Sequence, residues 1–76
     1  MENSYSAIEK AFLLNIGKRI KETRLQNKLS QEKFAQVCKL DRTYISDVER
    51  GERNISLLNL WKIAKALNTA IPILLE

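Results

Sequence analysis

The sequence contains no histidine and only one cysteine, Cys38. An internal disulfide is therefore excluded, and a metal site would need carboxylates alone as ligands. The chain also has only two glycines, with no glycine-rich phosphate-binding loop and no serine in a nucleophile elbow. We therefore expect no enzyme, no cofactor and no metal ion, and we interpret Cys38 as a reduced thiol in the core.

Long hydrophobic runs are also missing. No stretch approaches the roughly 18 consecutive apolar residues of a membrane span, and the N-terminus lacks the basic and apolar pattern of an export signal. The 76 residues, 45% of them apolar, suit one domain near the lower size limit for a stable core. We expect residues 1–76 to form a single cytoplasmic domain without a membrane partner, in which residues 1–6 fray.

The basic residues are unevenly distributed along the chain. The net charge is +4 at pH 7. Residues 17–28 carry five basic side chains against one acidic side chain, whereas the remainder of the chain is close to neutral. A modest basic bias of this kind suits a nucleic-acid partner.

Residues 30–51, SQEKFAQVCKLDRTYISDVERG, are predicted to form two short helices joined by a tight turn. Ser30 is a good N-cap for the first of these helices. The helix is not expected to continue through residues 39–41, because aspartate prefers a cap position to a helix interior. Its inward face is expected to comprise Phe34, Ala35 and either Cys38 or Val37.

The second helix of this pair, residues 42–50, has Asp41 as its N-cap and Gly51 where a left-handed residue ends a helix. Its inward face is expected to comprise Ile45, Val48 and Glu49. Its outward face carries side chains that donate, accept or stack: Arg42, Thr43, Tyr44, Ser46 and Asp47. A solvated helix face is the simpler interpretation, but the cap, the spacing and the glycine together predict a recognition helix in the major groove of DNA.

These runs resemble a known family. LSQEKFA, LDRTYIS and VERG are similar to the helix-turn-helix of Cro and phage-repressor-type bacterial regulators, and LDRTYIS with VERGERNIS resembles restriction–modification controller proteins most. The resemblance covers residues 16–75. It implies an all-α, five-helix, lambda-repressor-like domain that binds a pseudo-palindromic operator in double-stranded DNA as a homodimer. It also implies that the protein activates an endonuclease gene, with RNA polymerase as a partner, and represses once a second site is filled.

Three further helices are expected around the helix-turn-helix. The first, residues 7–27, begins with a capping box of Ser6 and Glu9, and Gly17 within it indicates close packing or a break. Its buried stripe is expected to comprise Ile8, Phe12, Ile16 and Ile20. The fourth helix, residues 57–67, is expected to face inward with Leu57, Leu60, Ile63, Ala64 and Leu67. Pro72 suits the first turn of a fifth helix, residues 72–75.

Four residues of the recognition helix are predicted to contact bases. Arg42 can read a guanine through O6 and N7, the commonest specific contact. Thr43 can offer its methyl group to thymine, and Tyr44 can press on the sugar–phosphate backbone or a base step. Ser46, about one turn from Arg42, can contact a base or a phosphate.

Other polar residues are assigned to the phosphates. In the resembling family, the glutamine that opens the first helix of the motif holds a phosphate at the helix N-terminus. The predicted phosphate contacts are Gln31, Arg53, Asn54, Lys28 and Lys39. Asp47 is a poor neighbour for phosphate, so we expect it to restrain Arg42 or Arg50, or to accept a hydrogen bond from a cytosine.

The resemblance also implies a structural ion pair between Arg24 and Glu49, which would tie the first helix to the recognition helix. Thr23 departs from the family, which usually has a large aliphatic residue at this position. We therefore expect a thinner core beside the pair and an intermediate loss of stability when the pair is broken.

The fourth helix also carries apolar residues on a side that does not face the core. The predicted dimer interface comprises Leu58, Trp61, Ile71, Leu74 and Leu75. Packing of these residues across a two-fold axis would place two recognition helices about one DNA turn, roughly 34 Å, apart. Alternatively, Trp61 folds under the N-terminal helix or remains singly exposed.

Other functions are compatible with parts of this pattern. A phage-type repressor or an antitoxin would keep the DNA-binding face and change only the regulatory role. A helical interaction module without DNA binding would have a recognition face poor in hydrogen-bond donors, which Arg42, Thr43 and Tyr44 argue against.

Overall fold

The computed structural model describes residues 5–76, which contain five α-helices and no β-strand. The helices are α1 (Ala7–Gln26), α2 (Gln31–Cys38), α3 (Arg42–Glu49), α4 (Leu57–Ala66) and α5 (Ile71–Leu74). The predicted all-α, five-helix fold is confirmed, and each predicted helix end lies within one residue of the observed end. In this described part of the chain, no helix is both long enough and apolar enough to cross a membrane.

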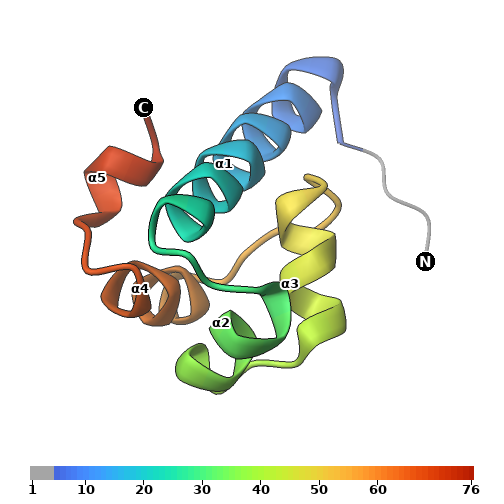
Figure 1. The fold of residues 1–76 in the computed structure, drawn as a ribbon. Coiled ribbons are helices and arrows are strands. Elements are labelled where there is room, and N and C mark those ends of the chain that lie inside the picture. Colours follow the sequence, from blue (N-terminus) through green and yellow to red (C-terminus); the bar gives the residue numbers. More distant parts are fainter. Residues whose placement is uncertain (1–4) are drawn as a thin grey trace.

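The five helices close a ring around the core. α1 contacts α3 and α5, α2 contacts α3 and α4, and α4 contacts α5. Figure 1 shows the long α1 crossing the molecule between α3 and α5, with α2 and α4 below it. The C-terminal half of α1 therefore belongs to the ring, whereas its N-terminal turns extend beyond it.

Side chains cap the first four helices. The residues that accept a hydrogen bond from a backbone N–H in the first turn are Ser6, Ser30, Asp41 and Ser56. At α1 the capping is reciprocal, since Glu9 accepts from the amide of Ser6 at 2.9 Å and Ser6 Oγ accepts from the amide of Glu9 at 3.1 Å. The expectation that residues 1–6 fray is therefore wrong at Ser6, and residues 1–4 lie outside the described part of the chain.

The core lies inside the ring and is apolar. Its members are Ile16, Ile20, Phe34, Ala35, Cys38, Ile45, Val48, Leu60, Ile63, Ala64, Leu67 and Leu74. The predicted burial of Cys38 is confirmed, whereas the alternative inward residue Val37 is exposed. Burial raises the pKa of the Cys38 thiol to about 11, which keeps it in the less reactive protonated form at neutral pH.

Three predictions about apolar residues are wrong. Ile8 and Phe12 are 83% and 53% exposed, because the turns of α1 that carry them extend beyond the ring of helices. Leu57 is 77% exposed in the first turn of α4 and does not join the inward stripe. Leu74 is fully buried because α5 folds back against α1 and α4. Leu74 therefore belongs to the core of the protomer and not to a dimer interface.

Gly17 sets the distance between α1 and α3. A Cβ atom at this position would lie 2.2 Å from the carbonyl oxygen of Val48 and 2.9 Å from that of Glu49. Since the opposing atoms are backbone, only glycine allows the two helices to approach this closely. Close packing, and not a break, explains the glycine in the middle of α1.

Candidate nucleic-acid interface

The turn of the helix-turn-helix fixes the direction of α3. Lys39 adopts a left-handed conformation, with φ of 59°. The amide of Leu40 then donates to the carbonyl oxygen of Ala35 at 3.0 Å, which ends α2 in a Schellman motif. Asp41 begins α3 by accepting a hydrogen bond from the amide of Thr43 at 3.1 Å. Both helix ends at the turn are therefore capped by hydrogen bonds.

The inward side of α3 is tied to α1 and α2 through Glu49. Arg24 donates to both carboxylate oxygens of Glu49, from Nε at 2.6 Å and from Nη2 at 3.0 Å, and its Nη1 donates to the carbonyl oxygen of Leu29 at 2.7 Å. The side-chain nitrogen Nε2 of Gln31 donates to Glu49 Oε1 at 3.0 Å. The Arg24 and Glu49 side chains are only 6% and 2% exposed. The pair is thus deeply buried, and the thinner core expected beside Thr23 does not open it to solvent.

The first turn of α3 presents two unengaged side chains to the outside. Arg42 and Thr43 are both exposed. Within residues 5–76, no hydrogen bond, ion pair or ring contact involves the side chain of Arg42. A guanidinium with five N–H donors is therefore available at the end of the helix where recognition helices meet base edges.

Tyr44 is less outward than the sequence suggested. It is half-buried and packs against the core, and its hydroxyl accepts a hydrogen bond from Asn59 Nδ2 at 3.1 Å. The guanidinium carbon of Arg53 lies 4.9 Å from the centre of the tyrosine ring, a cation–π distance. Tyr44 therefore ties α3 to α4 and holds Arg53 beside the recognition helix, while its contact with DNA remains a prediction.

The last turn of α3 carries a network of charges centred on Asp47. One carboxylate oxygen accepts from Arg50 Nη2 at 2.5 Å, and the other accepts from Arg53 Nε at 3.3 Å. Arg50 also donates to Ser46 Oγ and to Glu52. The hydrogen bond with Glu52, together with the charges of Glu52 and Asp47, raises the pKa of the Arg50 guanidinium above its ordinary value. Asp47 therefore restrains Arg50, one of the predicted alternatives, and in addition Arg53, but not Arg42.

Arg50 is the arginine of this network that we did not assign to DNA binding from the sequence. The signal was present, since Arg50 lies four residues after Ser46 and three after Asp47. Side chains at these spacings are neighbours on a helix surface. The involvement of Arg53 depends on the path of the loop after α3, which spacing alone does not give.

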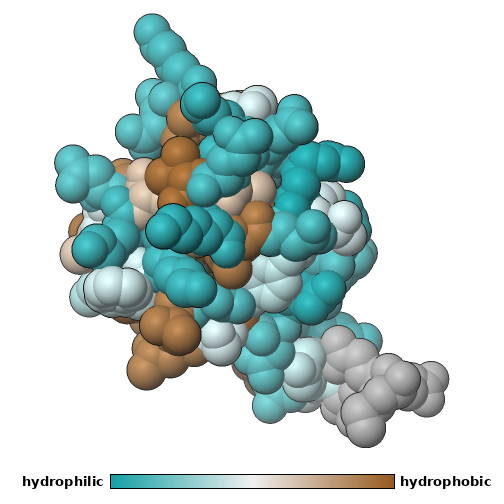
Figure 2. All heavy atoms as spheres, turned by 90° about the horizontal axis from the view of Figure 1, so that it is seen from below, coloured by the Kyte–Doolittle hydropathy of each residue, from teal (hydrophilic) through white to brown (hydrophobic). Residues whose placement is uncertain are grey.

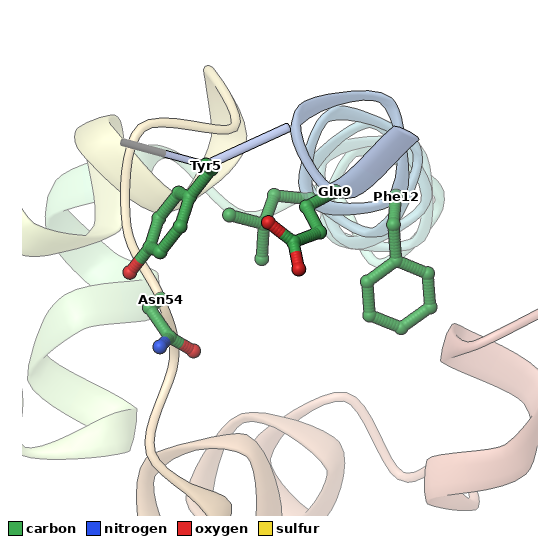
Figure 3. A pocket seen from close by; sticks show the side chains of 5 residues that line it. Tyr5, Glu9, Phe12 and Asn54 are labelled. Atoms are coloured by element: carbon green, nitrogen blue, oxygen red, sulfur yellow. The ribbon is translucent and has the colours of Figure 1, made fainter. Parts of the chain in front are cut away.

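The other predicted phosphate contacts are dispersed over the surface. Lys28 and Lys39 are exposed and left-handed, with φ of 58° and 59°; Lys28 is the second residue after α1, and Lys39 directly follows α2. Lys39 lines a groove of about 410 Å³ between α2 and α4. Asn54 lines a pocket of about 210 Å³ beside the first turns of α1, together with Tyr5 and Glu9 (Figure 3). The structure thus brings Arg53 to the recognition helix but places Asn54 towards α1.

Comparisons with known proteins agree with this geometry. A sequence model of the helix-turn-helix family matches residues 20–74. The chain is 50% identical over 64 residues to the control protein C.BamHI of Bacillus amyloliquefaciens, covering 83% of this chain and 79% of that protein. The fold is similar to the restriction–modification controller protein C.AhdI of Aeromonas hydrophila, with a TM-score of 0.82 and 45% identity over 84% of this chain and 97% of that one.

A second solved structure shows a related protein on DNA. It is the restriction–modification controller protein C.Esp1396I, a tetramer in complex with its natural 35 base-pair operator. The TM-score is 0.76 with 36% identity, and 83% of each chain is covered. The chain described here belongs to the helix-turn-helix family and, within it, to the restriction–modification controller proteins.

Proposed function

We propose that this protein is a sequence-specific DNA-binding regulator that controls the genes of a restriction–modification system. The observation that carries the proposal is the division of α3 into two sides. Its inward side is fixed by the buried pair of Arg24 and Glu49, and its outward first turn presents Arg42 and Thr43, whose side chains have no partner among residues 5–76. A rigid helix with unengaged donors at its N-terminal end is the arrangement that direct reading of the major groove requires.

The assignments within the interface follow from this orientation. Arg42 reads a guanine, Thr43 and Ser46 contact neighbouring bases, and Tyr44 contacts the sugar–phosphate backbone at the edge of the groove. The proposed phosphate contacts are Gln31, Arg53, Asn54, Lys28 and Lys39. Gln31 lies at the N-terminus of α2, where the helix dipole favours an anion.

A pseudo-palindromic operator requires two copies of α3, and we place the dimer interface on α4 and α5. Leu57, Leu58, Trp61 and Leu75 are exposed there, and Ile71 is half-buried beside them. Figure 2 shows that the face on the side of α2 and α4 carries hydrophobic patches between hydrophilic side chains. Covering such patches with a second copy would add to the small core of this chain.

Trp61 provides the test of this interface. Trp61→Ala should weaken dimerisation by about 2 kcal/mol, because truncated aromatic anchors near an interface centre commonly cost this much. Analytical ultracentrifugation at micromolar concentration measures the effect, with Ile8→Ala, at an exposed position in the first turn of α1, as the control. A Trp61→Ala variant as dimeric as wild type would place the interface elsewhere.

The regulatory role is proposed by analogy with the controller proteins that the chain resembles. We also propose that the protein acts in the cytoplasm. The dimer would bind upstream of its own gene and of an endonuclease gene, activate transcription by helping RNA polymerase to bind, and repress when a second site is filled. Footprinting of that upstream DNA, with in vitro transcription over a range of protein concentrations, tests it. Protection of two-fold related half-sites with transcription that rises and then falls supports a controller. Transcription that only falls supports a repressor, and no protection contradicts DNA reading.

A further inference from the structure

The two kinds of arginine on the DNA-facing side differ in their surroundings. Arg42 has no partner among the described residues, whereas Arg50 and Arg53 are both held by the carboxylate of Asp47. The Asp47 side chain is 21% exposed, and those of Arg50 and Arg53 are 54% and 47% exposed. With Glu52 as the second acceptor of Arg50, the two positive charges are balanced by two negative ones. This end of the recognition helix is therefore nearly neutral although it carries two arginines.

Asp47 also connects the recognition helix to the loop that carries Arg53. Its carbonyl oxygen accepts a hydrogen bond from the amide of Glu52 at 2.9 Å. This bond is possible because Gly51 is left-handed, with φ of 75°. The backbone carbonyl of Asp47 thus fixes the start of the loop, and its carboxylate fixes the direction of Arg53. The ring of Tyr44 contacts the Arg53 guanidinium from the other side.

The donors that remain available differ between the two arginines. Arg50 uses both terminal nitrogens within the network, Nη1 towards Ser46 and Nη2 towards Asp47 and Glu52. Arg53 uses only Nε for Asp47, so its two terminal nitrogens, which bond to none of the described residues, can form a bidentate contact with a phosphate. Arg53 can bind a phosphate that lies next to its terminal nitrogens while it stays paired with Asp47. To reach a phosphate at any other position, it must break the ion pair with Asp47.

We infer that Asp47 is a specificity-determining residue. This inference rests on the proposed DNA-reading function. Its carboxylate positions Arg53 for a phosphate in the register that the correct operator sets. On DNA of any other sequence, the same carboxylate cancels positive charge and retains the arginines that would otherwise bind whichever phosphate is near. Non-specific affinity comes almost entirely from such phosphate contacts. Asp47 therefore widens the difference between specific and non-specific binding by lowering the latter.

Glu52 supplies a matched control for charge. Asp47→Asn and Glu52→Gln each remove one negative charge from the same network. Glu52 is 61% exposed and holds Arg50 alone, at 3.3 Å, without contacting Arg53. If only net charge matters, the two variants should behave alike. If the position of Asp47 matters, Asp47→Asn should reduce specificity more.

The experiment measures binding to two duplexes of equal length by fluorescence anisotropy over a range of KCl concentrations. One is the duplex that wild type selects from a random-sequence library, and the other has mixed sequence. For Asp47→Asn we expect binding to the mixed duplex to tighten about tenfold, the ratio of the two affinities to fall about tenfold, and the salt slope on the mixed duplex to steepen by about one per protomer. Glu52→Gln should change the ratio less than about threefold, since its charge is exposed and screened.

The route through Arg53 is tested in a second background. In Arg53→Gln protein, adding Asp47→Asn should lower the ratio of affinities clearly less than it does in wild type, because only Arg50 remains for Asp47 to hold. Asp47→Ser should reproduce Asp47→Asn, and circular dichroism establishes that the variants remain folded. Equal ratios for Asp47→Asn and Glu52→Gln, or an undiminished effect of Asp47→Asn without Arg53, would overturn the inference. Equal binding of wild type to both duplexes would instead overturn the proposed function.

Discussion

Two carboxylates on α3, two residues apart in sequence, have opposite surroundings. Glu49 faces inward, is 2% exposed and binds Arg24, whereas Asp47 is 21% exposed and binds two arginines that are themselves about half exposed. A buried pair is strongly destabilising to break, because the remaining charge is left without solvent or partner. An exposed pair contributes little to folding and is available for exchange with another anion. A carboxylate–arginine pair therefore fixes α3 to the core on its inward side, whereas on its outward side such pairs influence DNA binding.

The largest expected effect comes from breaking the buried side. Arg24→Ala or Glu49→Ala should lower the free energy of unfolding by about 3–5 kcal/mol, since either change leaves a buried charge uncompensated. Thermal and urea unfolding followed by circular dichroism measure it. The double variant should lose much less than the sum of the two single losses. Additive losses would show that the two side chains do not act as a pair.

A substitution of Gly17 tests whether the packing of the buried side of α3 depends on its close approach to α1. Gly17→Ala should lower the free energy of unfolding by about 1–3 kcal/mol, because the new methyl group meets the backbone carbonyl of Val48 and overpacking costs this much. Lys18→Ala, at the exposed neighbouring position, is the control and should unfold like wild type. Equal stability of Gly17→Ala and Lys18→Ala would contradict the packing of α1 on α3.

The outward side should respond in binding and not in stability. Arg42→Ala should weaken binding to the selected operator by about 1–3 kcal/mol and leave the unfolding midpoint unchanged, because its side chain has no partner in the part of the chain that the structure describes. Arg53→Ala should weaken binding to all sequences and reduce the salt slope by about one per half-site. Gel shifts on operator and random duplexes distinguish the two. Equal losses of both variants on both duplexes would remove Arg42 from base reading.

The smallest expected effect sharpens the comparison within α3. Glu49→Gln and Asp47→Asn are the same acid-to-amide change on the two sides of one helix. Asp47→Asn should shift the midpoint of thermal unfolding only slightly, since its ion pairs are exposed to solvent. Glu49→Gln should shift it substantially. A loss of stability in Asp47→Asn equal to that in Glu49→Gln would end the distinction between the two carboxylates.

The helices themselves could be predicted because their signals are local. Serine or aspartate at the N-caps of α1 to α4 and a glycine after α3 define helix ends within a few residues of sequence. By contrast, the burial of an apolar stripe depends on helices that are distant in the sequence. Phe12 has the spacing of a buried residue but is 53% exposed, because its turn of α1 extends beyond the ring of helices, and Leu74 is buried because α5 turns back onto α1 and α4. For the same reason the bond from Gln31 to Glu49 and the position of Arg53 beside Tyr44 were not evident from spacing.

The most direct test of DNA reading by the first turn of α3 is affinity selection from a random-sequence duplex library, performed in parallel with wild type and Arg42→Ala. We predict that wild type enriches two related half-sites with a guanine at one defined position in each. The Arg42→Ala variant should enrich the same half-sites with that position randomised. Identical preferences for the two proteins, or no enriched half-site with wild type, would contradict the assignment of α3 as the element that reads sequence.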